Sequence, residues 1–503
     1  MLNVVGGVSG TLGQMGSNPR VLANSAPTLV SNLVGGWAVA GGAEFLSYVP
    51  GVGFGALNAA GFAGYHANYL PTVSQAGWNV RLAAAATVPA GGVTLNAVNL
   101  AGNFNLAFSN ASDVLNVVSG GLMRASNTPN SIGTAVLPGR LTAGGSAPSG
   151  VSDLYLYNNQ GTLTVNSLIV DNGGSPLRLV AGSANGGTTV LAGANTFTGG
   201  LVANQGVVQL NLTGANGLTA VAVPVAASGA DKTLMVDGGT VQWMAANQVA
   251  FGAVPTLSGS GALNLNGFDQ TLAGLVFTAN GGTPPNVLTG AGTLTLTGDI
   301  SVTNRSGNPS LAPSLGGKLD LGGGVRVIDV GSMVINGATD ITAANTTNFE
   351  GVTGFTLGAL VSSTLNPAVA GLTKRGNGAL ALAAQNTFSG GVAVEAGALV
   401  LGGSSTPVTP STQAMPVLVT SGPVGASDGS TNGFLTLSDG VTLRTDGTAR
   451  TIANPVRFSA GAPVLGITIG GTSAGFNLTL SGTVGLGGTN RLISVPNANV
   501  TLT

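Results

Sequence analysis

The 503-residue chain contains no cysteine and only one histidine, His66. Without cysteine it forms no disulfide and no thiolate metal site, and a single histidine nearly excludes a histidine-based zinc or haem centre. Charged residues make up 6% of the chain, against about 25% in an average soluble domain, and the net charge is −1. A nucleic-acid-binding protein needs a basic surface. We therefore expect no nucleic-acid partner, no metal and no cofactor.

Long apolar segments of the kind that form membrane helices are also lacking. The most apolar stretch, residues 33–65, contains Glu44, Pro50 and many glycines. Glycine costs a helix about 1 kcal/mol and proline about 3 kcal/mol per residue, so we expect no transmembrane helix. Apolar residues nevertheless make up 44% of the chain, which is enough to build a core and argues against disorder.

Short alternating segments joined by glycine-rich corners are abundant. Residues 293–297 read TLTLT, residues 318–327 read KLDLGGGVRV, and residues 434–443 read FLTLSDGVTL. Alternation with period 2 is typical of strands, and glycine suits corners because it accepts a positive φ at little cost. No segment shows a convincing helical period. The sequence predicts an all-β protein whose strands cover one another.

Two distant segments of the chain are similar. Residues 191–210 read LAGANTFTGGLVANQGVVQL, residues 382–401 read LAAQNTFSGGVAVEAGALVL, and nine of the twenty positions are identical. Such a repeat indicates a solenoid, in which each coil meets the same surroundings as the last. The shared structural positions are Asn195 and Asn386, Phe197 and Phe388, Gly199 and Gly390, Gly200 and Gly391, and Gly206 and Gly397.

The second copy extends further, as GLTKRGNGALALAAQNTFSGGVAVEAGALVLGG over residues 371–403. This segment resembles the passenger-associated repeat of autotransporter-type bacterial surface proteins, and the first copy matches from Gly187 onward without the lysine lead. The resemblance implies an exported β-helical protein displayed at the cell surface. It also implies outer-membrane association through regions outside this chain, whose two ends look cut from a longer protein.

We predict one elongated, right-handed parallel β-helix of about 20 coils, each of roughly 24 residues. Three solenoid segments are expected, 1–184, 185–375 and 376–503, the first with an aromatic-enriched stretch at 37–78. Both ends, Leu2 to Leu12 and Leu492 to Leu502, are apolar or alternating and almost uncharged. Uncapped strand edges pair with other chains, so we expect end-to-end self-association.

Charged residues offer no catalytic constellation. Asp320 and Asp329, and Asp439 and Asp446, are spaced by less than a coil, and the second pair lies in Asp-Gly turns. We interpret all four as corner residues and assign no catalytic residue. The basic doublet at 374–375 is expected to be a solvated turn.

The aromatic stretch is the one local enrichment that suggests a ligand. Trp37, Tyr65, Tyr69 and Trp78 are candidate carbohydrate contacts, because tryptophan and tyrosine present an apolar ring with a polar edge. The alternatives are a small inserted lobe, a wider part of the core, or a loop packed on the core.

The preferred hypothesis for function is a non-enzymatic segment of an exported bacterial surface protein. It would act as a stalk or an adhesive passenger, with host or environmental surfaces or glycans as partners. The alternatives are a polysaccharide-binding or polysaccharide-cleaving β-helix protein, and a fibre-forming structural protein.

Overall fold

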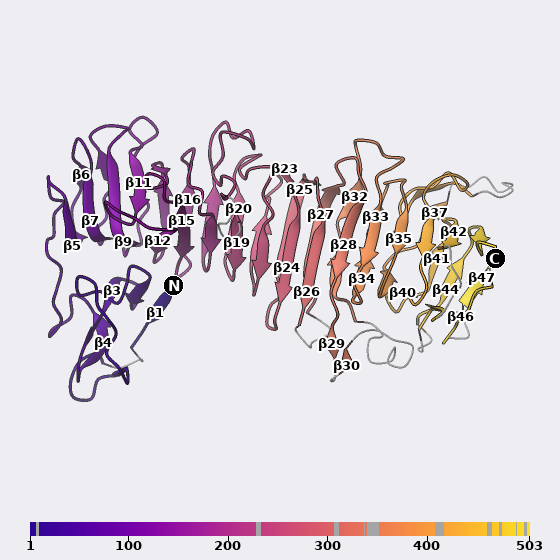
Figure 1. Cartoon of the computed structure of the whole chain (residues 1–503), viewed down its shortest axis with the longest axis horizontal. Helices are drawn as coiled ribbons and strands as arrows, with labels where there is room; N and C mark the ends of the chain where they lie inside the picture. The colour runs from indigo at the N-terminus through magenta and orange to yellow at the C-terminus, as the bar shows by residue number, and fades with distance from the viewer. Residues whose placement is uncertain are drawn as a thin grey trace. The chain divides into compact units, whose positions relative to one another are not determined.

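The computed structural model describes residues 1–6, 10–227, 233–305, 311–335, 338–339, 352–407, 417–459, 465–471, 475–488, 490–496 and 500–502. Within these ranges every regular element is a strand and none is a helix, which confirms the prediction of an all-β protein. The chain divides into two compact units, Met1–Ala253 and Val254–Thr503, which are described separately (Figure 1). The segment boundaries expected at 184/185 and 375/376 stay predictions.

From Gln75 onward, the chain of the N-terminal unit passes back and forth between two stacks of parallel strands. Sheet 1 comprises β5 (Gln75–Leu82), β7 (Val93–Leu100), β9 (Val114–Arg124), β11 (Arg140–Ala143), β12 (Ser152–Asn158), β14 (Leu168–Ile169), β15 (Leu177–Gly182), β17 (Leu201–Ala203) and β19 (Leu234–Asp237). Sheet 2 comprises β6 (Ala86–Val88), β8 (Leu106–Phe108), β10 (Asn130–Ile132), β13 (Thr162–Val165), β16 (Thr188–Leu191), β18 (Val207–Leu210) and β20 (Thr240–Trp243). Parallel neighbours need a long crossover, and passage through the opposite sheet supplies it.

Apolar side chains at matching register positions form the core of this unit. In sheet 1, Leu179 pairs with Leu201 and Leu201 with Leu234, and all three are fully buried. The matching column in sheet 2 contains Val165, Leu191, Leu210 and Trp243. Since successive side chains of a strand point to opposite faces, the alternating sequence directs one set inward in every coil. This burial is the main stabilising contribution, at about 25 cal/mol per Å² of apolar surface.

The C-terminal unit repeats the arrangement. Its first sheet comprises β21 (Thr256–Ser258), β24 (Leu275–Ala279), β26 (Ile300–Asn304), β28 (Arg326–Val330), β33 (Leu372–Arg375), β35 (Val392–Val394), β39 (Leu435–Leu437), β42 (Val456–Phe458) and β45 (Val484–Gly485). Its second comprises β22 (Ala262–Asn264), β23 (Gln270–Leu272), β25 (Asn286–Leu296), β27 (Ser314–Asp320), β31 (Phe355–Leu357), β32 (Leu360–Ser362), β34 (Ala379–Leu382), β36 (Ala398–Leu401), β40 (Thr442–Thr445), β43 (Ile467–Ile469) and β46 (Ile493–Ser494). The prediction of a parallel β-helix is confirmed.

Smaller elements complete the C-terminal unit. A third parallel sheet comprises β41 (Arg450–Ile452), β44 (Leu478–Leu480) and β47 (Val500–Leu502). Two antiparallel pairs lie apart from the three parallel sheets: β29 (Val334–Ile335) with β30 (Ala338–Thr339), and β37 (Thr406–Pro407) with β38 (Val419–Ser421).

The first residues of the chain form a lobe rather than a coil. The N-terminal lobe, residues 1–6 and 10–67, contains β1 (Leu2–Val4), β2 (Ala38–Ala40), β3 (Glu44–Val49) and β4 (Gly53–Ala56). β1 is parallel to β2, and the other two pairings are antiparallel. Figure 1 shows these strands beside the stack that begins at β5. The expectation that Leu2 to Leu12 form an edge of the coil stack is therefore wrong, because β1 pairs within the lobe.

The lobe covers part of the outer face of sheet 1. On this face the residues at one register position are Arg81, Asn99, Met123 and Tyr157, in β5, β7, β9 and β12. Met123 and Tyr157 are buried in one apolar cluster with Phe45 and Leu57 of the lobe. An outward position normally faces water, so the large apolar side chains here are explained by the lobe that covers them.

Candidate functional site

The asparagines of the two similar segments each join three coils. The Oδ1 atom of Asn195 accepts a hydrogen bond from the backbone N–H of Ile169 at 2.9 Å, and its Nδ2 donates to the carbonyl of Ala222 at 2.7 Å. Asn386 makes the same pair of contacts, to the N–H of Val361 at 2.9 Å and the carbonyl of Pro423 at 3.0 Å. Both asparagines are buried, so each satisfies backbone groups that water does not reach.

The aromatic residue and the glycine pair of the motif have distinct roles. Phe197 and Phe388 are fully buried. A Cβ on the first glycine of the pair, Gly199, would lie 2.5 Å from the backbone of Leu177 in the preceding coil, so this position requires a close approach that only glycine allows. The second glycine has a φ of +88° at Gly200 and +80° at Gly391, in the left-handed region. The first glycine therefore permits contact between coils, and the second permits the turn.

Lys374 differs from the sequence prediction. Its side chain is fully buried, and Nζ donates to the carbonyl oxygens of Arg375 at 2.6 Å, Gly376 at 2.5 Å and Ala396 at 3.1 Å. Burial lowers its pKa to about 7, an effect that nearby Asp329 opposes. The expected solvated turn is wrong for Lys374, because three corner carbonyls surround the amine. Arg375 is exposed, as expected, but it is the last residue of β33 and not part of a turn, and it pairs with Glu395 at 2.6 Å.

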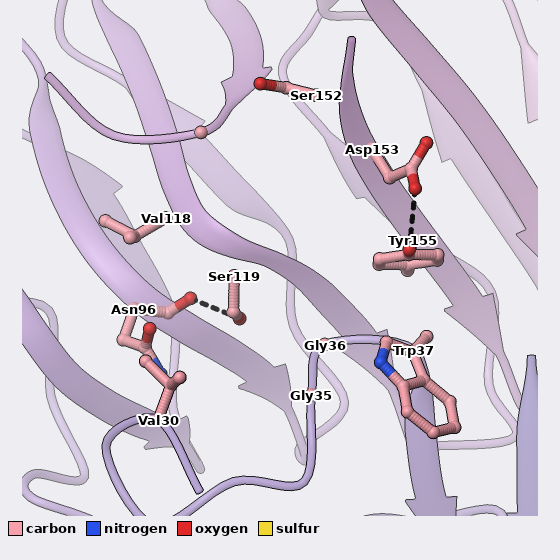
Figure 2. A pocket seen from close by; sticks show the side chains of 11 residues that line it. Val30, Gly35, Gly36, Trp37, Asn96, Val118, Ser119, Ser152, Asp153 and Tyr155 are labelled. Carbon is pink, nitrogen blue, oxygen red and sulfur yellow. Dashed lines mark hydrogen bonds between the residues drawn. The ribbon is translucent and has the colours of Figure 1, made fainter. Parts of the chain in front are cut away.

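A groove lies between the N-terminal lobe and sheet 1 of the N-terminal unit (Figure 2). Its volume is about 350 Å³, within the range of about 300–1,000 Å³ typical of small-molecule sites. The lobe contributes Val30, Gly35, Gly36 and Trp37; β7, β9 and β12 with their corners contribute Asn96, Val118, Ser119, Gly144, Ser152, Asp153 and Tyr155. A Cβ on Gly36 would lie 2.3 Å from the carbonyl oxygen of Ser119, so glycine there lets the lobe reach the coil.

Polar groups of the groove are arranged around one carboxylate. Asp153 accepts hydrogen bonds from the Tyr155 hydroxyl at 2.7 Å and from Nε of Arg178 at 2.6 Å. Burial, together with the adjacent Asp153 carboxylate, raises the pKa of Tyr155, so its phenol remains protonated and a donor. On the other side, Ser119 donates to the carbonyl of Asn96 at 2.6 Å, and the side-chain oxygen of Asn96 has no hydrogen-bond partner.

Only one of the four aromatic residues predicted to contact carbohydrate lies in this groove. Trp37 lines it, whereas the hydroxyl of Tyr65 donates to Glu44 at 2.7 Å, and Trp78 stacks on His66 with 6.1 Å between ring centroids. Tyr69 is 58% exposed and makes neither kind of contact. Asp153 and Tyr155 were not among the predicted contacts, although the alternation SDLYLYN over 152–158 places these two residues on one face of a strand.

A family model described as passenger-associated-transport-repeat matches residues 184–210, 287–303 and 372–401. The chain carries passenger-associated transport repeats. The first and third matches contain the two asparagine corners, as the sequence resemblance implied. The repeat at 287–303 was missed, because it lacks the Asn-Thr-aromatic element and retains only the lead, a Gly-x-Gly followed by an alternating strand. In the structure this strand is part of β25, with Leu294 and Leu296 fully buried.

One curated relative of this repeat-bearing chain is the "Adhesin BmaC autotransporter" of Brucella suis biovar 1 (strain 1330). The two are 29% identical over 416 residues, which cover 74% of this chain and 11% of the relative. The chain thus spans about a ninth of the length of the relative that it matches. No solved structure matches it significantly.

Three of the four aspartates interpreted as corner residues serve corners, whereas the interpretation is wrong for Asp329, which lies exposed within β28. Asp320 accepts backbone hydrogen bonds from Gly322 and Thr364, and Asp439 accepts them from Leu465 and Gly466. Asp446 pairs with Arg450 at 2.6 Å. The described residues contain no group of three or more His, Cys, Asp or Glu side chains that could hold a metal ion. In the same part of the chain, no helix is long and apolar enough to cross a membrane.

Proposed function

We propose that this chain is a non-enzymatic, β-helical segment of an exported bacterial surface protein, and that it acts there as a stalk or an adhesive passenger. The observation that carries the proposal is the recurrence of the passenger-associated transport repeat on a parallel β-helix. The relative in Brucella suis is named an adhesin and an autotransporter, which supports the adhesive role. The segment lies outside the cell and is attached to the outer membrane through other regions.

A β-helix suits this role for a physical reason. Each coil is stabilised by its neighbours, so the fold forms by adding coils and needs no disulfide or cofactor. The chain has no cysteine, and its corners are closed by asparagine, glycine and lysine contacts. Such a chain folds in any redox environment, including outside the cell.

Surface display tests the proposal. The chain is fused to a heterologous outer-membrane anchor in a non-adherent bacterium, and attachment to cultured epithelial cells and to abiotic surfaces is counted. We expect greater attachment than with the anchor alone, and removal of the displayed chain by external protease. A displayed, folded chain that promotes attachment to neither surface would contradict the adhesive role and leave the stalk role.

The non-enzymatic part of the proposal has its own test. Incubation of the purified chain with neutral and acidic polysaccharides should release no new reducing ends or unsaturated products. Cleavage that disappears in Asp320→Asn or Asp439→Asn would overturn this part.

A further inference from the structure

We infer that the groove beside Trp37 binds an uncharged sugar residue of a surface glycan. The groove is defined by Trp37 of the lobe and by Asn96, Ser119, Asp153 and Tyr155 of the coils. This inference deepens the proposed adhesive function, and rests on it, by naming the chemical class of ligand. Three features of the groove support the inference. They are the exposed ring of Trp37, the hydrogen-bond acceptors of Asn96 and Asp153, and the pairing of Asp153 with Arg178.

The indole of Trp37 is held in place and remains accessible. It is 38% exposed, although large apolar side chains in the surrounding cluster are buried. The backbone carbonyl of Trp37 accepts a hydrogen bond from the N–H of Leu2 at 3.0 Å. The indole also packs closely on Gly35, since a Cβ at this glycine would lie 2.3 Å from Nε1 of Trp37. Sugar rings present faces of C–H groups that pack on an aromatic ring, while the indole N–H remains a donor.

The polar wall of the groove offers mostly acceptors. Asn96 is 1% exposed, and its side-chain oxygen has no hydrogen-bond partner, which is unfavourable for a buried acceptor. The carboxylate of Asp153 has about four acceptor sites, of which Arg178 and Tyr155 occupy three. A ligand that carries several hydroxyl donors would satisfy these oxygens.

The charges select against ionic ligands. Asp153 is already paired with Arg178, with 2.6 Å between Oδ1 and Nε. An anionic sugar would place its carboxylate near Asp153, and a cation would approach the guanidinium of Arg178, so either brings an uncompensated like charge. Neutral hydroxyl groups avoid both penalties. Figure 2 shows Trp37, Tyr155 and Asp153 on one side of the groove and Asn96 and Val118 on the other.

The groove exists only while the lobe is docked, since Trp37 comes from the lobe and the acceptors come from sheet 1. Nδ2 of Asn99 in β7 donates to Oε2 of Glu44 at 3.1 Å and to the hydroxyl of Tyr65 at 3.2 Å, so both lobe residues are fastened to the coil. Loosening this contact should therefore weaken binding of the sugar without touching the groove itself.

The test uses the purified full chain and a panel of uncharged methyl glycosides of glucose, galactose, mannose and N-acetylglucosamine. Saturation-transfer NMR and tryptophan fluorescence report binding, with N-acetylneuraminic acid and choline as the charged comparators. We expect at least one neutral glycoside to bind with a Kd of about 1 mM, and Trp37→Ala to weaken it by about tenfold or more. Trp78→Phe, outside the groove, is the matched control and should leave the Kd unchanged.

Further variants keep the inference falsifiable if Trp37→Ala perturbs the lobe. Val118→Trp fills the groove without removing a contact, and it should abolish binding while circular dichroism stays unchanged. Tyr65→Phe should weaken binding several-fold. No binding by any neutral glycoside at about 10 mM, or tighter binding of choline or N-acetylneuraminic acid, would overturn the inference.

Attachment of displaying cells separates the two proposals. If wild-type cells attach and cells displaying Val118→Trp attach equally well, the groove inference fails and the adhesive function stands. If wild-type cells do not attach but the purified chain binds a glycoside, the adhesive function fails and the groove inference stands.

Discussion

Lys374 and Ser183, 191 residues apart, each bind backbone groups at a buried corner between two strands of a repeat. Lys374 donates to three carbonyls, among them that of Ala396 in the next coil. Ser183 donates to the carbonyl of Asn159 in the preceding coil at 3.0 Å and accepts the N–H of Gly187 at 2.6 Å. A buried hydrogen-bonding side chain therefore closes both corners, although in strand register Ala181, and not Ser183, is the residue that matches Lys374.

The buried amine makes stability depend on pH. The pKa of Lys374 is about 7 in the folded chain and about 10.4 when unfolded, so between these values the unfolded state binds more protons. Stability should therefore rise as the pH increases from about 7 to about 10, by up to a few kcal/mol, and should not change through this group below pH 7. Urea denaturation at pH 7 and pH 9.5 measures the effect.

Substitution of the lysine isolates that effect. Lys374→Met removes the titration, and it leaves three corner carbonyls without a donor, so we expect a loss of about 1–3 kcal/mol at pH 7. Its urea midpoint should also lose the rise between pH 7 and pH 9.5 that wild type shows. Arg375→Met, at an exposed position, is the control and should keep the rise. An equal rise in Lys374→Met and wild type would contradict the assignment.

Replacement of the motif asparagines should destabilise the coils. Asn195→Leu leaves the N–H of Ile169 and the carbonyl of Ala222 without partners, and we expect a loss of about 1–3 kcal/mol for each buried group. Asn386→Leu should cost a similar amount, since its contacts are the same. Asn211→Leu, at an exposed position, should change the free energy of unfolding by less than about 0.5 kcal/mol. Thermal melts followed by circular dichroism compare the three variants.

Alanine substitutions at Gly199 and at Gly200 should destabilise the fold for different reasons. Gly199→Ala should cost several kcal/mol, since its Cβ meets the rigid backbone of Leu177 at 2.5 Å. Gly200→Ala forces alanine into a φ of +88° and should cost about 1–2 kcal/mol. The control is Gly174→Ala, where nothing lies within 4 Å and φ is not positive, and it should be neutral or slightly stabilising. A neutral Gly199→Ala would show that the coils separate readily at this corner.

The polar contact between lobe and coil should control docking of the lobe. Glu44 is 9% exposed and accepts hydrogen bonds from Arg81 at 2.9 Å and from Tyr65 at 2.7 Å. Tyr65→Phe removes one donor from the buried carboxylate, at a cost of about 1–3 kcal/mol. Hydrogen exchange in β2 and β3 should accelerate, while that of β17 and β19 stays unchanged. Tyr69→Phe, at an exposed ring, is the control and should leave both rates as in wild type.

Self-association remains a prediction. The strand edges that would cause it include one that differs from the N-terminal edge expected from the sequence. Among the described strands, β46 pairs only with β43, and β6 pairs only with β8. The edge of β5 is partly covered, since the N–H of His66 donates to the carbonyl of Asn79 at 2.9 Å. We expect sedimentation to show concentration-dependent association of the purified chain. A lysine at an edge opposes pairing, so Ser494→Lys in β46 should reduce association, and a strictly monomeric wild type would contradict the prediction.

The sequence alone determined the fold class and the location of the two repeats that contain Asn195 and Asn386. Alternation and glycine corners are local properties, so TLTLT at 293–297 reads as a strand wherever the chain places it. The equivalence of Asn195 and Asn386 was visible for the same reason, because similar coils need similar corner residues. The sequence did not reveal that Lys374 is buried, since a lysine in a glycine-rich turn looks like any solvated lysine.

Tertiary structure alone decided where the N-terminal residues lie and which residues form the groove. Strand patterns do not specify a partner, so nothing in Leu2–Val4 indicated pairing with Ala38–Ala40 instead of with a coil. Trp37 and Asp153 line one groove because the N-terminal lobe docks on the outer face of a parallel sheet. That contact depends on shape and burial between segments more than a hundred residues apart, and no local pattern encodes it.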